Sequence, residues 1–274
     1  MATPPTTAFE ITEATFAYPE TKALDTVTLT IGRNERIALL GANGSGKSTL
    51  LRLLAGLAFP SAGSVRFFGV PVTEASFAKD SFSREFRRRV GVVFQNSDVQ
   101  LFNPTVFDEV AFGPMQLGWS RQEILDRVDA QLDELDILHL KHRPPHRLSG
   151  GEKKRVALAS VLIMNPDVLL VDEPIAALDP KSQGQVIDFL FGCAGSKTVI
   201  TATHDLSIVE DIADRCVVLD GGRVARDGTP REILEDWDLL QRAHLVHTHR
   251  HRHASGEIHA HPHLHAGRSL EEIG

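Results

Sequence analysis

The stretch GANGSGKST, Gly41–Thr49, restricts the possible folds of this 274-residue chain more than any other feature. It fits the phosphate-loop pattern G-x-x-x-x-G-K-[ST], and it lies between an apolar run and a helical stretch that extends to about Leu57. Glycine lets backbone N–H groups turn toward a polyphosphate, and the positive end of the helix dipole faces the same anion. A glycine-rich turn without a ligand is the alternative, which the strand and helix context disfavours. Lys47 is expected to reach the β- and γ-phosphates. The residues predicted to bind the nucleotide are Gly41, Asn43, Gly44, Ser45, Gly46, Lys47, Ser48 and Thr49.

Two acidic residues follow another apolar run. The run Val168–Val171 leads directly into Asp172 and Glu173. An acid at the carboxyl end of such a strand can hold Mg²⁺ through water, together with the hydroxyl of Ser48, because Mg²⁺ prefers oxygen ligands. We therefore predict that Asp172 is the metal partner and that Glu173 is the general base for attack of water on the γ-phosphate. An acidic helix start is the alternative, and it is weaker because both acids follow a wholly apolar strand.

Gln95 and His204 also follow predicted strands. Gln95 comes directly after Val90–Phe94, and His204 follows Thr198–Ala202. The glutamine is predicted to reach Mg²⁺ or the attacking water, and the imidazole to hydrogen-bond the γ-phosphate. A lone histidine in this place is ordinarily a satisfied polar residue, and only the nearby phosphate loop favours a catalytic role.

Strands and helices alternate through most of the chain. Alternating β-branched and aromatic residues from Phe9 to Ile31 predict antiparallel strands at the edge of the domain. From about residue 98 to 160 the pattern is helical, which predicts an inserted helical subdomain, with a capping box at Ser120 and Glu123. The other apolar runs predict an α/β fold with a mainly parallel sheet covered on both faces. These runs include Val90–Phe94, Val168–Val171, Thr198–Ala202 and Cys216–Leu219.

The sequence LSGGE at Leu148–Glu152 opens a second helix with features of an anion site. Ser149 and Glu152 fit a capping box, and Gly150 and Gly151 leave the first-turn N–H groups sterically open. A domain that binds one nucleotide has no use for two such helix starts. We therefore predict that this one faces the γ-phosphate of a nucleotide held by another copy of the chain. A plain helix cap is the alternative.

Taken in order, these motifs resemble those of ATP-binding-cassette (ABC) ATPases over about residues 9–242. The resemblance implies a phosphate-loop fold, ATP and Mg²⁺ as cofactors, and a head-to-tail dimer with two ATP molecules at its interface. It implies that Tyr18 stacks on adenine. Local sequence alone favours this role and ordinary side-chain packing equally. It also implies that Asp179 links the two sites across the dimer. The shared motifs are the phosphate loop, Gln95, LSGGE, Val168–Glu173, Leu178 with Asp179, and His204.

Residues 90–118, VGVVFQNSDVQLFNPTVFDEVAFGPMQLG, resemble the ATPases of energy-coupling-factor importers in particular. Ser97 and Val99 depart from the usual N-P-D-D-Q-L-F, and Glu152 replaces the more common glutamine of the signature. The resemblance implies a translocase subunit at the cytoplasmic face of the membrane. It would act as a homodimer with an integral membrane energy-coupling subunit and a substrate-binding membrane subunit. Cobalt or nickel is the expected cargo. A vitamin importer, and a soluble ABC ATPase outside transport, are the alternatives.

Composition restricts partners and location. The formal net charge of −7 argues against a nucleic-acid partner. No apolar run approaches the roughly 20 residues of a membrane-spanning helix, and the N-terminal residues lack the features of a signal peptide, so we expect a cytosolic chain. The two cysteines, Cys193 and Cys216, match no metal or redox spacing and are predicted to be free buried thiols.

A histidine-rich segment ends the chain. The predicted organisation is an ATPase domain at residues 1–243 and a tail at 244–274, which holds nine of the 13 histidines. Their H-x-H spacing puts alternate residues on one face of an extended chain, and neutral imidazole binds Ni²⁺, Co²⁺, Cu²⁺ or Zn²⁺. The segment is predicted to be disordered without metal. A dispensable polar tail is the alternative. The predicted ligands for nickel or cobalt are His244, His247, His249, His251, His253, His259, His261, His263 and His265.

Overall fold

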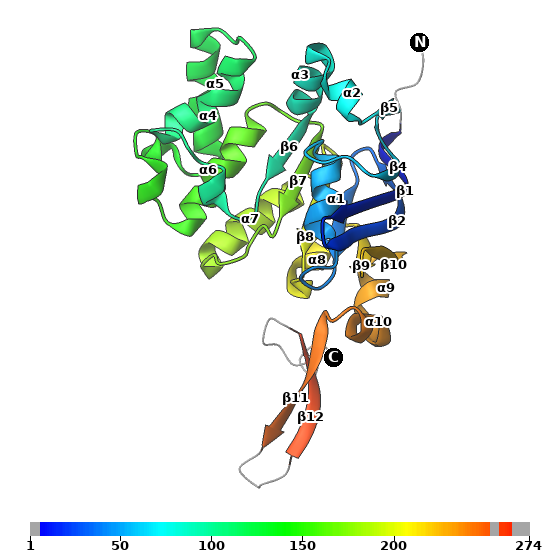
Figure 1. Ribbon diagram of the computed structural model, residues 1–274. Coiled ribbons are helices and arrows are strands. Elements are labelled where there is room, and N and C mark those ends of the chain that lie inside the picture. Colours follow the sequence, from blue (N-terminus) through cyan, green and yellow to red (C-terminus); the bar gives the residue numbers. More distant parts are fainter. Residues whose placement is uncertain (1–5, 253–257, 265–274) are drawn as a thin grey trace.

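A six-stranded sheet forms the centre of the protein (Figure 1). The computed structural model describes residues 6–252 and 258–264, with side-chain contacts up to Val246. Five strands of this sheet run parallel, and β10 pairs antiparallel with β9 at one edge. In spatial order the strands are β10 (Arg223–Gly228), β9 (Arg215–Asp220), β3 (Arg36–Leu40), β8 (Thr198–Thr203), β7 (Val168–Asp172) and β6 (Val90–Val93).

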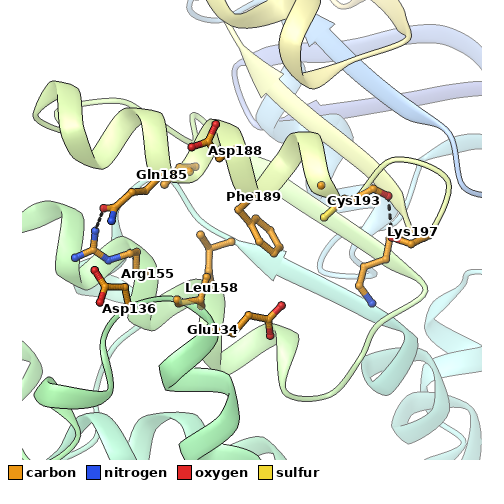
Figure 2. Close-up of a pocket in the computed structure, with 13 residues that line it drawn as sticks. Glu134, Asp136, Arg155, Leu158, Gln185, Asp188, Phe189, Cys193 and Lys197 are labelled. Atoms are coloured by element: carbon orange, nitrogen blue, oxygen red, sulfur yellow. Dashed lines mark hydrogen bonds between the residues drawn. The ribbon is translucent and has the colours of Figure 1, made fainter.

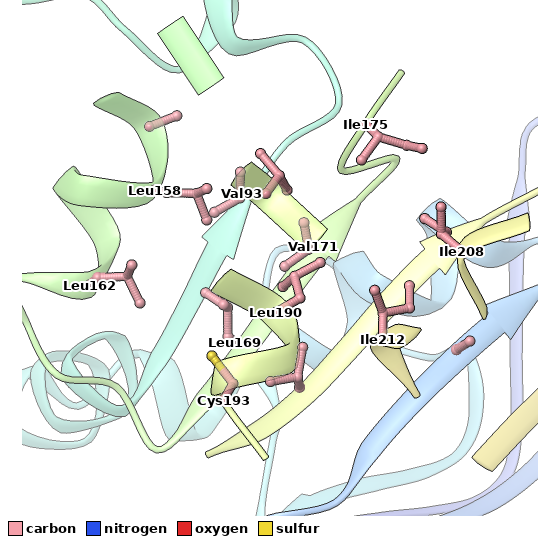
Figure 3. Packing of buried hydrophobic residues seen from close by; sticks show 14 of the residues in the cluster. Val93, Leu158, Leu162, Leu169, Val171, Ile175, Leu190, Cys193, Ile208 and Ile212 are labelled. Carbon is pink, nitrogen blue, oxygen red and sulfur yellow. The ribbon is translucent and has the colours of Figure 1, made fainter. Parts of the chain in front are cut away.

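Both faces of this sheet are buried, which explains why its strands are continuous apolar runs. Because successive side chains of a strand point to opposite faces, each strand contributes to two clusters. In β3, Ala38 and Leu40 belong to one cluster, whereas Ile37 and Leu39 belong to the other. Figure 3 shows part of the first cluster, where Leu169 and Val171 of β7 lie near Leu190 of the helix α7 (Pro180–Gly192).

An antiparallel sheet of four strands covers the second cluster, in the order β2-β1-β4-β5. This is the antiparallel edge subdomain that the sequence predicts. The helix α1 (Lys47–Leu54) and a group of ring contacts around Phe67, Phe77 and Phe86 fill the space between the two sheets. The other elements of this region are β1 (Thr7–Tyr18), β2 (Thr21–Gly32), β4 (Ala62–Phe67), β5 (Val70–Pro71), α2 (Glu74–Phe77) and α3 (Asp80–Arg89).

A group of helices lies on the other side of the central sheet (Figure 1), as predicted for residues 98–160. It contains α4 (Val106–Gln116), α5 (Arg121–Glu134) and α6 (Gly150–Leu162), with the short turns η1 (Ser97–Val99), η2 (Leu138–Leu140) and η3 (Pro145–Arg147). The Ser120 hydroxyl accepts from the N–H of Glu123, but no reciprocal bond from that glutamate is present, so the capping box predicted there is only half formed.

The sequence pattern predicts that α1, α4 and α5 end at about Leu57, Gly118 and Ile137, and each helix ends two or three residues earlier. For α1 and α5, the backbone conformation just after the helix explains the early end. Positive φ values at Gly56 (65°) and Asp136 (55°) turn the chain away soon after α1 and α5, a conformation that periodicity does not reveal.

The chain ends with η4 (Leu206–Ile208), α8 (Val209–Ile212), α9 (Pro230–Leu234), α10 (Trp237–Arg242) and a hairpin of β11 (Val246–Arg252) and β12 (Ile258–Leu264). The hairpin extends away from the body beyond α10 (Figure 1). Leu245 and Val246 belong to the first core cluster, so the packed body continues past residue 243. The structure pairs residues 246–252 with residues 258–264 in two strands, and disorder of the tail without metal stays a prediction. The predicted ligands His253 and His265 lie outside the described residues.

Cys193 and Cys216 are free and buried, as predicted. Burial raises the pKa of the Cys216 thiol to about 12. Among the described residues, no helix is long and apolar enough to span a membrane.

Candidate nucleotide site

The predicted catalytic residues meet at one edge of the central sheet because three neighbouring strands end there. In β3, β8 and β7 the register pairs Leu40 with Thr203 and Asp172 with Ala202. The residues that follow, Gly41, His204 and Glu173, are therefore brought to the same carboxyl edge. In parallel α/β sheets this edge is where ligands bind.

The phosphate loop has a backbone that requires glycine at two positions. Gly41 has φ 151° and Gly46 has φ 108°. A Cβ at Gly41 would lie 2.4 Å from the carbonyl oxygen of Leu219, and one at Gly46 would lie 2.6 Å from that of Ala23. The tip of the β9–β10 hairpin supports the loop, because the Gly222 N–H donates to the carbonyl oxygen of Ser45 at 3.1 Å. The loop is thus tightly enclosed by backbone from distant parts of the chain.

Lys47 is buried at the start of α1, and its ammonium group lies over the loop. Its Nζ donates to the carbonyl oxygens of Gly41 at 2.6 Å and Ala42 at 3.1 Å. Burial lowers the pKa of Lys47, and the carboxylates of Glu173 and Asp172 partly oppose this effect. The ammonium is held where a phosphate bound by the loop would accept its hydrogen bonds.

Asp172 fits the predicted role of Mg²⁺ partner. Its Oδ1 atom is buried and has no hydrogen-bond partner among the described residues. Burial raises the pKa of this carboxyl, while a hydrogen bond from Ser48 lowers it. A buried carboxylate oxygen beside a serine hydroxyl is the oxygen environment that Mg²⁺ takes. Ser48 and Asp172 therefore fit this ion, and Gln95, the third predicted ligand, lines the cavity beside the phosphate loop.

Glu173 is fixed by two neighbours at the end of β8. Its Oε2 accepts from the hydroxyl of Thr203 at 3.1 Å, and its Oε1 lies 2.7 Å from Nδ1 of His204. Glu173 is buried, with 6% of its surface exposed, and its backbone has φ 45°. His204 therefore contacts the predicted base, a pairing that the sequence analysis did not foresee.

A cavity of about 260 Å³ lies beside the phosphate loop. Its lining includes Tyr18, Asn43, Lys47, Gln95 and Glu173, so it joins the predicted adenine-stacking residue to the catalytic ones. The Tyr18 hydroxyl accepts from Arg52 at 2.9 Å, and hydrogen bonding to Thr49, more than to Arg52, lowers its pKa. Tyr18 is 39% exposed, which leaves surface available to pack against a base.

The LSGGE segment has the predicted helix cap but lies outside this cavity. The Ser149 N–H donates to Oε2 of Glu152 at 2.7 Å, and the Glu152 N–H donates to the Ser149 hydroxyl at 3.3 Å, which completes a capping box. No residue of LSGGE is among the residues that line the cavity. Within the described part of the chain, the two predicted anion-binding helix starts do not form one site.

Gly151 of LSGGE and Asp179, which precedes α7, have roles in packing that the sequence did not indicate. A Cβ at Gly151 would lie 2.0 Å from the Ser182 hydroxyl oxygen, so this glycine permits close approach of α6 and α7. Asp179 caps α7, and its two carboxylate oxygens accept from the Ser182 backbone N–H at 3.1 Å and hydroxyl at 2.6 Å. These bonds lower the pKa of the Asp179 carboxyl. Gly150, by contrast, is exposed at the helix start.

The sequence analysis missed several buried charged residues, and two of them lie beside the segment that follows β6. Lys154 of α6 donates to the carbonyl oxygens of Phe94 at 3.0 Å and Gln95 at 3.5 Å, and burial lowers its pKa to about 8. Glu109 of α4 accepts from the backbone N–H groups of Phe102 at 2.9 Å and Asn103 at 2.8 Å. Both hold parts of the segment that follows β6. Neither belongs to a recognisable motif, so only tertiary contacts reveal them.

A larger cavity, of about 500 Å³, lies between α6 and α7 (Figure 2). Its lining carries both signs of charge, including Glu134, Arg155 and Lys197, and shares no residue with the cavity at the phosphate loop. Size therefore does not identify the nucleotide site. Two of the predicted catalytic residues, Gln95 and Glu173, line the smaller cavity, and His204 is not among its lining residues.

The phosphate loop, the buried lysine and the acid pair define the class of protein as a phosphate-loop nucleoside triphosphatase. The comparisons give its family. The family model described as ABC transporter matches residues 24–176. The chain is 54% identical over 245 residues to the nickel import ATP-binding protein NikO of Rhodobacter capsulatus, which covers 88% of this chain and 96% of that protein.

Two further comparisons agree. The chain is 42% identical to the energy-coupling factor transporter ATP-binding protein EcfA of Methanothermobacter thermautotrophicus, covering 86% of this chain and 75% of that protein. The solved structure of cbiO1 from Clostridium perfringens, part of the ABC transporter complex cbiONQ, has a TM-score of 0.75 and 37% identity. It covers 87% of this chain and 95% of that one. The chain belongs to the ABC transporter family, as an ATP-binding protein of the energy-coupling-factor type that couples ATP hydrolysis to transport.

Proposed function

We propose that this chain is the ATPase subunit of an importer for nickel or cobalt ions. In this proposal it acts as a homodimer bound to the cytoplasmic face of the membrane. Two ATP molecules are held between the phosphate loop of one copy and the LSGGE segment of the other. The proposal of a dimer is supported by the separation of the starts of α1 and α6. The cavity at the phosphate loop is lined by none of the same chain's LSGGE residues.

The roles of the residues follow from their contacts. Lys47 binds the β- and γ-phosphates, and Tyr18 packs against adenine. Glu173 accepts the proton of the attacking water, and His204 orients Glu173 through the 2.7 Å contact and lies near the γ-phosphate. When bound by Ser48, Asp172 and Gln95, Mg²⁺ would neutralise charge on the phosphate oxygens. Asp179 and Ser149 face the second copy.

An apolar surface next to Gln95 supports a membrane subunit as partner. Val99, Phe102 and Met115 are 72%, 67% and 53% exposed, and the Phe102 and Phe112 rings lie 5.2 Å apart, edge to face. Large exposed apolar groups that gather on one surface mark interaction sites. Glu109 fixes the backbone at Phe102, so the surface is held in place. We propose that it contacts a cytoplasmic segment of the integral membrane energy-coupling subunit, which works with a substrate-binding membrane subunit.

The cargo assignment is supported by the relatives named above. One of them is named for nickel import, and the solved structure belongs to the complex cbiONQ. Vitamin import remains the competing outcome.

The test measures cellular uptake of labelled nickel and cobalt with the native membrane partners present, comparing wild-type protein with Glu173→Gln. We expect Glu173→Gln to lower both ATP hydrolysis and the uptake of at least one ion. The expected decrease is about 10²- to 10⁴-fold, the usual contribution of a general base. ATP binding should persist, because the amide removes only the base. Ser120→Ala, a helix-cap variant far from the cavity, is the matched control.

Uptake of neither ion above background, in cells where the complex assembles, would overturn the cargo assignment and direct the test to vitamins. Normal hydrolysis by Glu173→Gln would overturn the assignment of the base.

A further inference from the structure

The tail hairpin pairs histidine with histidine. In the register of β11 and β12, His247 lies opposite His263, His249 opposite His261, and His251 opposite His259. The intervening pairs contain no histidine: they are Val246 with Leu264, Thr248 with Pro262, Arg250 with Ala260, and Arg252 with Ile258.

This register separates the two faces of the hairpin. Because alternate residues of a strand share a face, all six paired histidines fall on one face, and the other face carries none. Directly opposed residues of an antiparallel pair have Cβ atoms about 4.5–5.5 Å apart, whereas diagonal neighbours are about 7–8 Å apart. Opposed positions are therefore close enough for two imidazoles to share one ion.

We propose that this face binds divalent transition-metal ions, one between each opposed pair of histidines. Neutral imidazole is a ligand for Ni²⁺, Co²⁺, Cu²⁺ and Zn²⁺. The three sites are His247 with His263, His249 with His261, and His251 with His259. His244 lies before the hairpin, with φ 54°, and belongs to none of them. The proposal concerns binding by the tail and holds whether or not the importer carries the same ion.

The hairpin is attached to the body at its base. Leu245 and Val246 are 1% and 5% exposed and belong to the core cluster that also contains Leu239 and Leu240 of α10. A two-stranded hairpin alone is marginally stable in water, and an ion that joins both strands stabilises the paired form. Metal binding therefore fixes the two strands relative to each other. The first residues of the hairpin are already packed against the ATPase body.

The test compares two double variants of the full-length protein that contain the same number of histidines. His249→Ala with His261→Ala removes one opposed pair and leaves two complete. His249→Ala with His259→Ala removes one member from each of two pairs and leaves one complete. Equilibrium dialysis with Ni²⁺ alone, without nucleotide, measures the number of ions bound tightly. We expect the first variant to lose one ion relative to wild type and the second to lose two.

The control is His142→Ala with His146→Ala, which removes two exposed histidines outside the tail and should lose none. Equal losses in the two tail variants would overturn the proposal, because the number of ions bound by an unstructured tail depends on the number of histidines and not on their pairing. Absence of Ni²⁺ binding by the wild type would also overturn it. Hydrogen exchange gives a second measurement: amides of β11 should exchange more slowly with Ni²⁺ in the wild type, and no change there would contradict the paired sites.

Discussion

The helices α1 and α6 both begin with glycine-rich segments, yet their first turns are built differently. At α1 the preceding residue is Gly46, in the left-handed conformation, and no side chain caps the helix. At α6 a complete capping box joins Ser149 to Glu152. The start of α1 lines a cavity together with Lys47 and Glu173, whereas that of α6 is exposed at Ser149 and Gly150.

The difference shows which helix start is built to hold a ligand within the chain. The backbone N–H groups in the first turn of α1 have no side-chain cap and remain available to a bound anion, and buried charged side chains lie around them. The start of α6 is stable without any ligand, because its own side chains satisfy two of its N–H groups. A helix start that is already stable and exposed suits a surface that meets another molecule. Lys154 connects the two regions, since it extends from α6 to the carbonyl oxygens of Phe94 and Gln95.

Lys47→Met should have the largest effect on the α1 side of this comparison. Hydrogen bonds to charged groups contribute about 1.5–3 kcal/mol each, so losing two phosphate contacts should weaken ATP binding about 100-fold or more. Thermal stability without nucleotide should be kept or raised, because the variant removes a buried ammonium. Calorimetric titration with ATP and thermal unfolding measure the two effects. A variant that binds ATP normally would show that α1 needs no charge in its first turn.

Lys154→Met tests the connection between the two regions through pH. The folded protein holds the pKa of Lys154 at about 8, below its ordinary value of 10.5, because of burial. The unfolded chain therefore binds more protons between these values, and stability rises with pH in that window. Wild type should gain up to about 3 kcal/mol relative to the variant between pH 8 and 10.5. Urea unfolding of both proteins at several pH values measures this gain. Parallel curves would mean that Lys154 is not desolvated.

Ser149→Arg should act on α6 alone. A large cation at the exposed helix start should block closure of the dimer and reduce hydrolysis about tenfold or more, which corresponds to about 1.4 kcal/mol. Binding of ATP to the monomer should be unchanged. Ser120→Arg is the matched control, because the Ser120 hydroxyl likewise accepts from the backbone N–H three residues on, and Ser120 is also exposed. If both variants hydrolyse ATP equally well and close into dimers by solution scattering, α6 does not face a nucleotide.

Tyr18→Phe should have the smallest effect. It keeps the ring and removes the hydroxyl that accepts from Arg52, an exposed hydrogen bond worth less than about 1 kcal/mol. ATP affinity, measured by fluorescence titration, should change by less than about threefold. A larger loss would indicate that the hydroxyl, and not the ring, contacts the nucleotide.

The sequence predicted those parts of the site that local patterns encode. A phosphate loop needs its glycines and lysine in consecutive positions, and parallel strands bring their end residues to one edge, so Lys47, Asp172, Glu173 and His204 could be placed together. The contact between His204 and Glu173 could not be predicted, because it depends on the register of β7 and β8.

Contacts between distant segments account for most of what was missed. The close approach of Gly151 to Ser182 depends on how α6 packs on α7, and Glu109 on how α4 meets residues 102 and 103. In the tail, the alternation of histidine with other residues is typical of a strand, and the structure pairs residues 246–252 with 258–264. The alternation was visible in the sequence, but the pairing partner of each residue was not.

The backbone of Glu173 has a consequence for how this protein would respond to selection. Its φ of 45° lies in the left-handed region, which costs a residue other than glycine, asparagine or aspartate about 1 kcal/mol or more. Glycine at this position would relieve the strain and remove the proposed general base. A laboratory screen for heat resistance alone would therefore tend to enrich glycine at residue 173 among inactive survivors, so the most strained acid of this site persists only while its activity is selected.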